Sequence, residues 1–73
     1  MTKNTLMDAL ETGVEVAFFK KNGDTRKMTA VINPDGQPDN YSNSDAVSVI
    51  DCMTGAFRAI KASSVLSING VMV

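Results

Sequence analysis

One stretch decides the fold of this chain: Val14-Glu-Val-Ala-Phe-Phe-Lys-Lys-Asn-Gly-Asp-Thr-Arg-Lys-Met-Thr-Ala-Val-Ile32. Apolar residues alternate with polar ones on both sides of Asn22-Gly23, and this pattern is the strongest short-range signal of a β-hairpin. The segments around it could pack against such a ribbon. The residues therefore predict a small, mainly β domain.

The hydrophobic pattern also predicts how the two strands of this hairpin pair, because a shift by one residue sends every side chain to the opposite face. A two-residue loop at Asn22-Gly23 would pair Val16 with Thr29 and mix the faces. A three-residue loop ending at Gly23, with that glycine in the left-handed bulge position, pairs Val16 with Met28 instead. We therefore expect a buried face of Val14, Val16, Phe18, Met28, Ala30 and Ile32, and an outer face of Glu15, Ala17, Phe19, Thr25, Lys27, Thr29 and Val31.

We expect one short helix and five strands in the whole chain. The helix is predicted over residues 5–12, because Thr5 and Asp8 have the spacing of a capping box and Gly13 has the usual position of a C-terminal glycine. The strands are predicted over residues 14–21, 24–33, 46–52, 56–61 and 65–68.

The third and fourth strands are expected to form a second hairpin around Thr54-Gly55. A tight two-residue turn there would place Asp51 opposite Arg58, an opposite-charge pair. Cys52 falls within the third strand, where we expect a small buried hydrophobic residue rather than a reactive thiol. The apolar tail Val71-Met72-Val73 could add to a sheet edge, in this chain or in another.

Residues 33–45 form a long segment of turn formers without periodicity. Loops of this length in a small domain are usually functional or disordered. Two interpretations stay open for it: a mobile excursion, or a loop whose one large side chain, Tyr41, reaches a ligand or a neighbouring subunit.

Length and composition predict a single domain over residues 1–73 with a thin hydrophobic core, which oligomerisation would reinforce. One cysteine excludes an intrachain disulfide framework and fits a reducing compartment. The apolar residues near the start are interrupted by Asp8 and Glu11, so we expect neither a signal peptide nor a membrane span. We therefore expect a cytoplasmic protein that forms homo-oligomers.

Enzymatic chemistry is not expected. The chain has no histidine, which excludes Ser-His-Asp and Cys-His sites. Asp35, Asp39 and Asp45 lack the spacing and the closing glutamate of a calcium loop. The sequence thus predicts no catalytic residues, no metal and no cofactor.

The net charge is only −1, yet six of the seven basic residues gather in two short regions. These six are candidates for binding phosphate: Lys20, Lys21, Arg26, Lys27, Arg58 and Lys61. The alternative is a solvated hairpin tip. Among them, Phe19 could be a stacking platform for a base or a contact between subunits, and the tail Val71-Met72-Val73 is the other candidate for such a contact.

The order of the predicted elements resembles that of the Sm-like and SH3-like small barrels. Two regions are similar to those of short bacteriophage proteins with an Sm-like SH3 barrel, a family grouped with the WYL domain. The first is Val16-Ala-Phe-Phe-Lys-Lys-Asn-Gly-Asp-Thr-Arg-Lys-Met28, and the second is Val49-Ile-Asp51 followed by Gly55-Ala-Phe-Arg-Ala-Ile-Lys-Ala-Ser-Ser-Val-Leu-Ser-Ile68. The Trp-Tyr-Leu triplet of that domain is absent, so no ligand residue follows from the resemblance.

The resemblance implies a five-stranded SH3-like or Sm-like barrel with a short N-terminal helix, and a phage accessory protein made against the host. We therefore expect a non-enzymatic protein of host takeover or anti-defence, active in the host cytoplasm. It would either sequester a nucleotide-type signal or occlude a host protein. The alternative is an Sm-like protein that binds RNA or single-stranded DNA.

Overall fold

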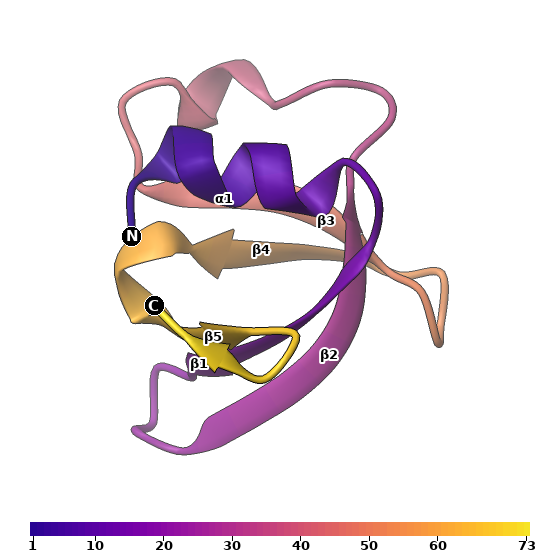
Figure 1. Cartoon of the computed structure of the whole chain (residues 1–73). Coiled ribbons are helices and arrows are strands. Elements are labelled where there is room, and N and C mark those ends of the chain that lie inside the picture. The colour runs from indigo at the N-terminus through magenta and orange to yellow at the C-terminus, as the bar shows by residue number, and fades with distance from the viewer.

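The computed structural model describes all 73 residues as one antiparallel sheet with a short helix beside it (Figure 1). The elements are α1 (Lys3–Leu10), β1 (Val14–Phe19), β2 (Thr25–Ile32), β3 (Ala46–Asp51), β4 (Phe57–Lys61), β5 (Val65–Ile68) and β6 (Val71–Met72), with 3₁₀ turns η1 (Asp39–Tyr41) and η2 (Ala62–Ser64). The strand order is β4-β3-β2-β1-β5-β6. The mainly β class is confirmed, but the sheet has six strands rather than five.

The sixth strand is the apolar tail, which adds to the β5 edge of its own chain. Val71 pairs with Ile68, and Met72 pairs with Ser67. The connecting residues Asn69 and Gly70 have φ angles of 51° and 80°. Two positive φ angles in succession are what a two-residue hairpin turn requires, so this pair allows the chain to reverse sharply.

The register predicted for the first hairpin is confirmed. Val16 pairs with Met28, the Lys20 N–H donates to the Asp24 carbonyl at 2.7 Å, and Gly23 has a φ of 89°. The predicted inner face supplies much of the core, with Phe18 and Ile32 packed at its margin. Ala17 was predicted on the outer face and is buried instead, because its one methyl group lies between Lys27 of β2 and Ser67 of β5.

The register predicted for the second hairpin is wrong by two residues. Val49, not Asp51, lies opposite Arg58. The loop has four residues, 52–55, because the Asp51 carboxylate accepts a hydrogen bond from the Met53 N–H at 2.9 Å and so opens an Asx turn. Cys52 therefore lies in this loop and is exposed, whereas we expected it buried in a strand.

The helix begins two residues earlier than predicted, at Lys3, and ends at Leu10. Thr2 rather than Thr5 is the N-cap, since the Thr2 hydroxyl accepts a hydrogen bond from the Thr5 N–H at 3.2 Å. Leu6 and Leu10 are fully buried and dock α1 against β2 and β3. At eight residues, α1 is too short to cross a lipid bilayer.

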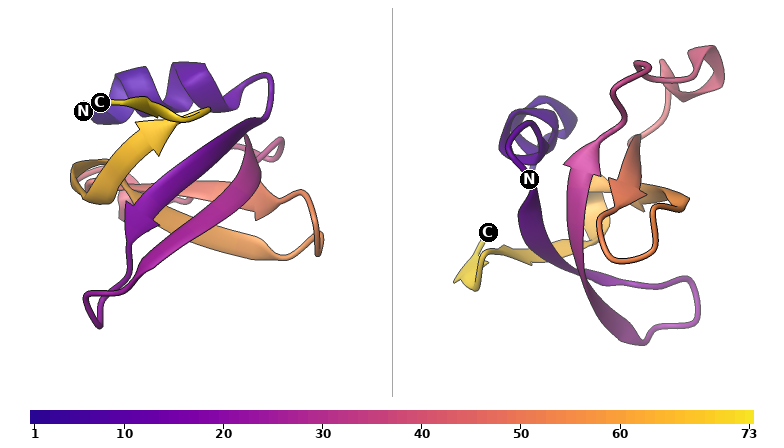
Figure 2. Two further views of the ribbon diagram at one scale, coloured as in Figure 1. Left: turned by 60° about the horizontal axis from the view of Figure 1, so that its bottom comes forward. Right: turned by 90° about the vertical axis from the view of Figure 1, so that its right-hand side faces the viewer.

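The sheet is strongly curved rather than flat. Figure 2 shows β2 bending around the core, with α1 lying at one open end. A register shift between Ala17 and Phe18, where β1 pairs with β5, adds local twist. The short turn η2 leads directly from β4 to β5, which brings the end of β4 near the tip of the first hairpin, although β4 and β5 form no ladder.

Candidate ligand-binding grooves

The largest hollow lies between the tip of the first hairpin and the end of β4, and we call it the lysine groove. Its volume is about 480 Å³. Six of its lining residues carry its chemistry: Phe18, Phe19, Lys20, Lys21, Ala59 and Lys61. The structure therefore brings three of the six basic candidates together with two phenylalanines.

Two local features place these side chains. Ile60 is buried in the core, so the alternation of β4 directs its neighbours Ala59 and Lys61 outward. The Ser64 hydroxyl donates to the Lys61 carbonyl at 2.7 Å and fixes the backbone where β4 ends. On the facing side, β1 ends at Phe19 and its last residues continue directly into the lysines of the loop.

The electrostatic character of the lysine groove is positive. No acidic side chain lines it, and none of its lysines is within ion-pair distance of a carboxylate, since the one salt bridge joins Arg26 to Asp51. The nearby Asp45 is engaged elsewhere. Hydrogen bonds from the Ser63 hydroxyl and the Ser63 N–H, together with the positive charge of Lys61, lower the pKa of that carboxyl below 3.8.

Two basic candidates do not belong to the groove. The Arg26 guanidinium lies 3.6 Å from the buried Asp51 carboxylate. Lys27 pairs with Ala17 on the outer face of the ribbon and is exposed. Although both were candidates for phosphate binding, neither lines a hollow of the structure.

The remaining candidates, Arg58 and Tyr41, line a second hollow, which we call the tyrosine groove. Its volume is about 450 Å³, and it is more open than the lysine groove. Pro38 and Tyr41 form its loop side, while Phe57, Arg58 and Ala59 form its sheet side. Ala59 lines both hollows, so the two grooves are neighbours.

Side-chain hydrogen bonds tie the long loop to the rest of the molecule. The Gln37 amide donates to the Ser48 carbonyl at 3.0 Å and accepts from the Ser48 N–H at 2.6 Å. The Lys3 ammonium donates to the carbonyls of Tyr41 and Ser44 at 2.6 and 3.0 Å. These bonds place Tyr41 beside the tyrosine groove, and its contact with a ligand or a neighbouring subunit stays a prediction.

Phe18, Phe57 and Ala59 were missing from the sequence-based candidates for a ligand site. The alternation within Phe57-Arg-Ala-Ile-Lys61 carried a usable signal, because a buried Ile60 places Phe57, Ala59 and Lys61 on the opposite, outer face. Phe57 is 62% exposed, which is unusual for a phenylalanine in a strand.

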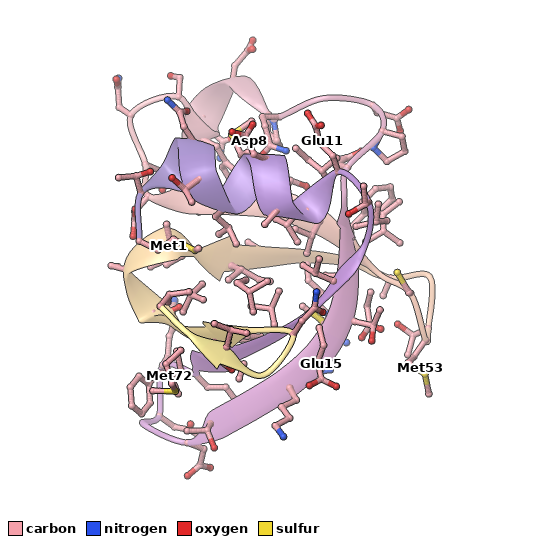
Figure 3. The ribbon with its side chains drawn as sticks, in the orientation of Figure 1. Met1, Asp8, Glu11, Glu15, Met53 and Met72 are labelled. Atoms are coloured by element: carbon pink, nitrogen blue, oxygen red, sulfur yellow. The ribbon has the colours of Figure 1, made fainter.

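Further apolar side chains are exposed outside the grooves, in addition to Phe19, which lines the lysine groove. Met53 projects from the tip of the second hairpin, and Met72 lies on the outermost strand (Figure 3). The predicted subunit contacts all have free surface: Phe19 is 49% exposed, Val71 69%, Met72 75% and Val73 55%.

Comparison of the chain with protein-family models, with curated proteins and with solved structures gives no match.

Proposed function

We propose that this chain is a non-enzymatic binding protein with a small SH3-like or Sm-like barrel, and that its lysine groove takes a nucleotide-type anion. Its resemblance to short bacteriophage proteins supports a role as a phage accessory protein of host takeover or anti-defence. In that role the protein sequesters a nucleotide signal in the host cytoplasm.

One observation carries this proposal: Lys20, Lys21 and Lys61 converge on a groove that contains two phenylalanines and no carboxylate. Ammonium groups without a protein partner are suited to phosphate oxygens. An aromatic ring beside them gives a base a surface on which to stack. The groove volume also lies within the range of small-molecule sites.

A second candidate function is the occlusion of a host protein. It is favoured by the exposed apolar side chains of the second hairpin, Met53 at 87% and Phe57 at 62% exposure. Exposed apolar groups that lie near each other often mark protein contacts.

Isothermal titration calorimetry with adenosine and guanosine mono- and triphosphates tests the nucleotide proposal. We expect the wild type to bind, and Lys61→Ala to weaken binding by about tenfold or more, since a hydrogen bond to a charged group contributes roughly 1.5–3 kcal/mol. Lys27→Ala is the matched control, because Lys27 is an exposed lysine of the same hairpin region outside the groove. No binding at millimolar nucleotide, or an equal loss in Lys27→Ala, would overturn the proposal.

A further inference from the structure

We infer that the ligand carries two nucleobases joined by a phosphodiester, with one base in each groove and the linkage crossing Ala59. This inference rests on the proposed function and specifies its ligand class. It excludes a single mononucleotide as the best ligand.

The first ground is the continuity of the two grooves. Ala59 lines both of them, and it is an exposed residue with a single methyl group. A larger side chain at this position would separate the grooves, whereas the alanine methyl group leaves them connected. A ligand long enough to enter both can therefore lie across β4.

The second ground is that each groove offers an aromatic surface for a base. The lysine groove has Phe18 and Phe19, and the tyrosine groove has Tyr41 and Phe57. The free ammonium groups belong to the lysine groove, because Arg58 pairs with the buried Val49 and its side chain leaves β4 on the face opposite to Phe57 and Ala59. Two stacking surfaces beside one set of cations suit two bases joined by one phosphate linkage.

The spacing of the grooves indicates how the bases would be held. Phe57 and Lys61 are four residues apart in an extended strand, so their α-carbons are about 13 Å apart. Bases stacked on each other as in a duplex are only about 3.4 Å apart. The two bases must therefore be splayed, as in single-stranded recognition, with each base on its own aromatic partner.

The free polar groups suggest little discrimination between bases. In the tyrosine groove, the Asn33 amide donates to the Ser48 hydroxyl at 3.1 Å and accepts from the Asp35 N–H at 2.9 Å. The Tyr41 hydroxyl forms no hydrogen bond within the chain, so it remains available to a ligand. Recognition by stacking tolerates different bases, because every base has an aromatic face.

Titration with adenosine monophosphate, the linear dinucleotide pApA and a ten-residue oligoadenylate tests this inference. We expect the wild type to bind pApA about 5-fold to 150-fold more tightly than the mononucleotide, which is the range that one added base–aromatic stack supplies. Phe57→Ala should remove that advantage, so that the variant binds pApA no more tightly than the mononucleotide. Unfolding midpoints of both proteins establish that the variant is folded, and Tyr41→Ala provides a second variant from the loop side.

The outcomes separate this inference from the proposed function. If pApA binds no more tightly than the mononucleotide, or if Phe57→Ala and Tyr41→Ala both retain the advantage, the two-base ligand is wrong while the nucleotide groove stands. If no nucleotide binds, the proposed function falls and this inference falls with it. Equal affinity for pApA and for the decamer would identify a free dinucleotide as the ligand. A further tenfold gain in affinity for the decamer would identify a single-stranded nucleic acid as the ligand. Both outcomes support a site for two bases.

Discussion

Arg26 on β2 forms an ion pair with Asp51 at the end of β3, with 3.6 Å between Nη2 and Oδ2. The Asp51 side chain is 4% exposed and that of Arg26 is 38% exposed. The other carboxylate oxygen of Asp51 accepts the Met53 N–H at 2.9 Å. One buried carboxylate thus joins the loop of the second hairpin to β2, the strand on the other side of β3 from β4.

Removal of this carboxylate should destabilise the fold. Asp51→Ala leaves the Met53 N–H without its acceptor and Arg26 without its partner, so we expect a loss of about 2–3 kcal/mol in the free energy of unfolding. Arg58→Ala should change it by less than about 0.5 kcal/mol, since that residue is exposed and forms no salt bridge. Urea denaturation of the two variants measures the difference, and equal losses would contradict the assignment.

The two hairpins show which registers a sequence can predict. The first was predictable because its alternatives differed by one residue, and only one of them separated the apolar from the polar face. In the second, the predicted and observed registers differ by two residues, which leaves every side chain on the same face. Hydrophobic alternation cannot distinguish these, and the deciding bond from Met53 to Asp51 has no periodic signal.

The candidate site was predictable only in part, for a similar reason. The sequence marked Lys20, Lys21 and Lys61 as basic residues near hairpins, but their convergence depends on the curvature of the sheet and on the short turn η2. Arg26 and Lys27 also lie within four residues of the hairpin tip in sequence. They are absent from the groove because one is paired with Asp51 and the other faces outward.

Gly23→Val should destabilise the protein through the backbone alone. Gly23 has a φ of 89°, and a Cβ added there would meet no atom within 4 Å. A β-branched residue is strongly disfavoured at positive φ, so we expect a loss of about 1–3 kcal/mol. Gly23→Asn is the control with a smaller expected loss, because asparagine tolerates the left-handed region better. Unchanged thermal stability of the valine variant would refute the bulged loop.

Met28→Asp should unfold the domain, whereas Lys27→Asp should not. Met28 is 6% exposed and belongs to the core, and its neighbour Lys27 is exposed. A carboxylate at the buried position has no partner there, and we expect a loss of more than about 4 kcal/mol. Circular dichroism during heating compares the two proteins, and similar midpoints would show that the faces of β2 are wrongly assigned.

The stabilising contribution of Asp45 should depend on pH. Its pKa is lowered in the folded state relative to 3.8, mainly by hydrogen bonds from Ser63, so its ionised form favours folding. This contribution is therefore complete above the unfolded pKa and is lost as the pH falls through the lower folded pKa. Unfolding midpoints of wild type and Asp45→Asn between pH 6 and pH 2 should differ at pH 6 and converge at the acidic end. A difference that is constant with pH would exclude the charge as its source.

We expect the protein to form a homo-oligomer in which Phe19 or the tail Val71-Met72-Val73 is buried between subunits. These side chains are about half to three-quarters exposed in the single chain, and a domain of 73 residues has little core to spare. Multi-angle light scattering at micromolar concentration measures the mass. A measured mass of 7.8 kDa, which is that of one chain, would contradict the homo-oligomer. An unchanged oligomer in a chain that ends at Gly70 would move the contact to Phe19.

The hydrogen bonds of Gln37 have a consequence for β3. β2 pairs with β3 as far as Ile32 and Val49, and one residue further the Asn33 N–H still donates to the Ser48 carbonyl at 3.1 Å. The primary amide of Gln37 donates to the same carbonyl and accepts from the Ser48 N–H, as a peptide group in a neighbouring strand would. A side chain thus completes the pairing of β3 where β2 ends, which leaves the Ser48 N–H unavailable to a foreign backbone.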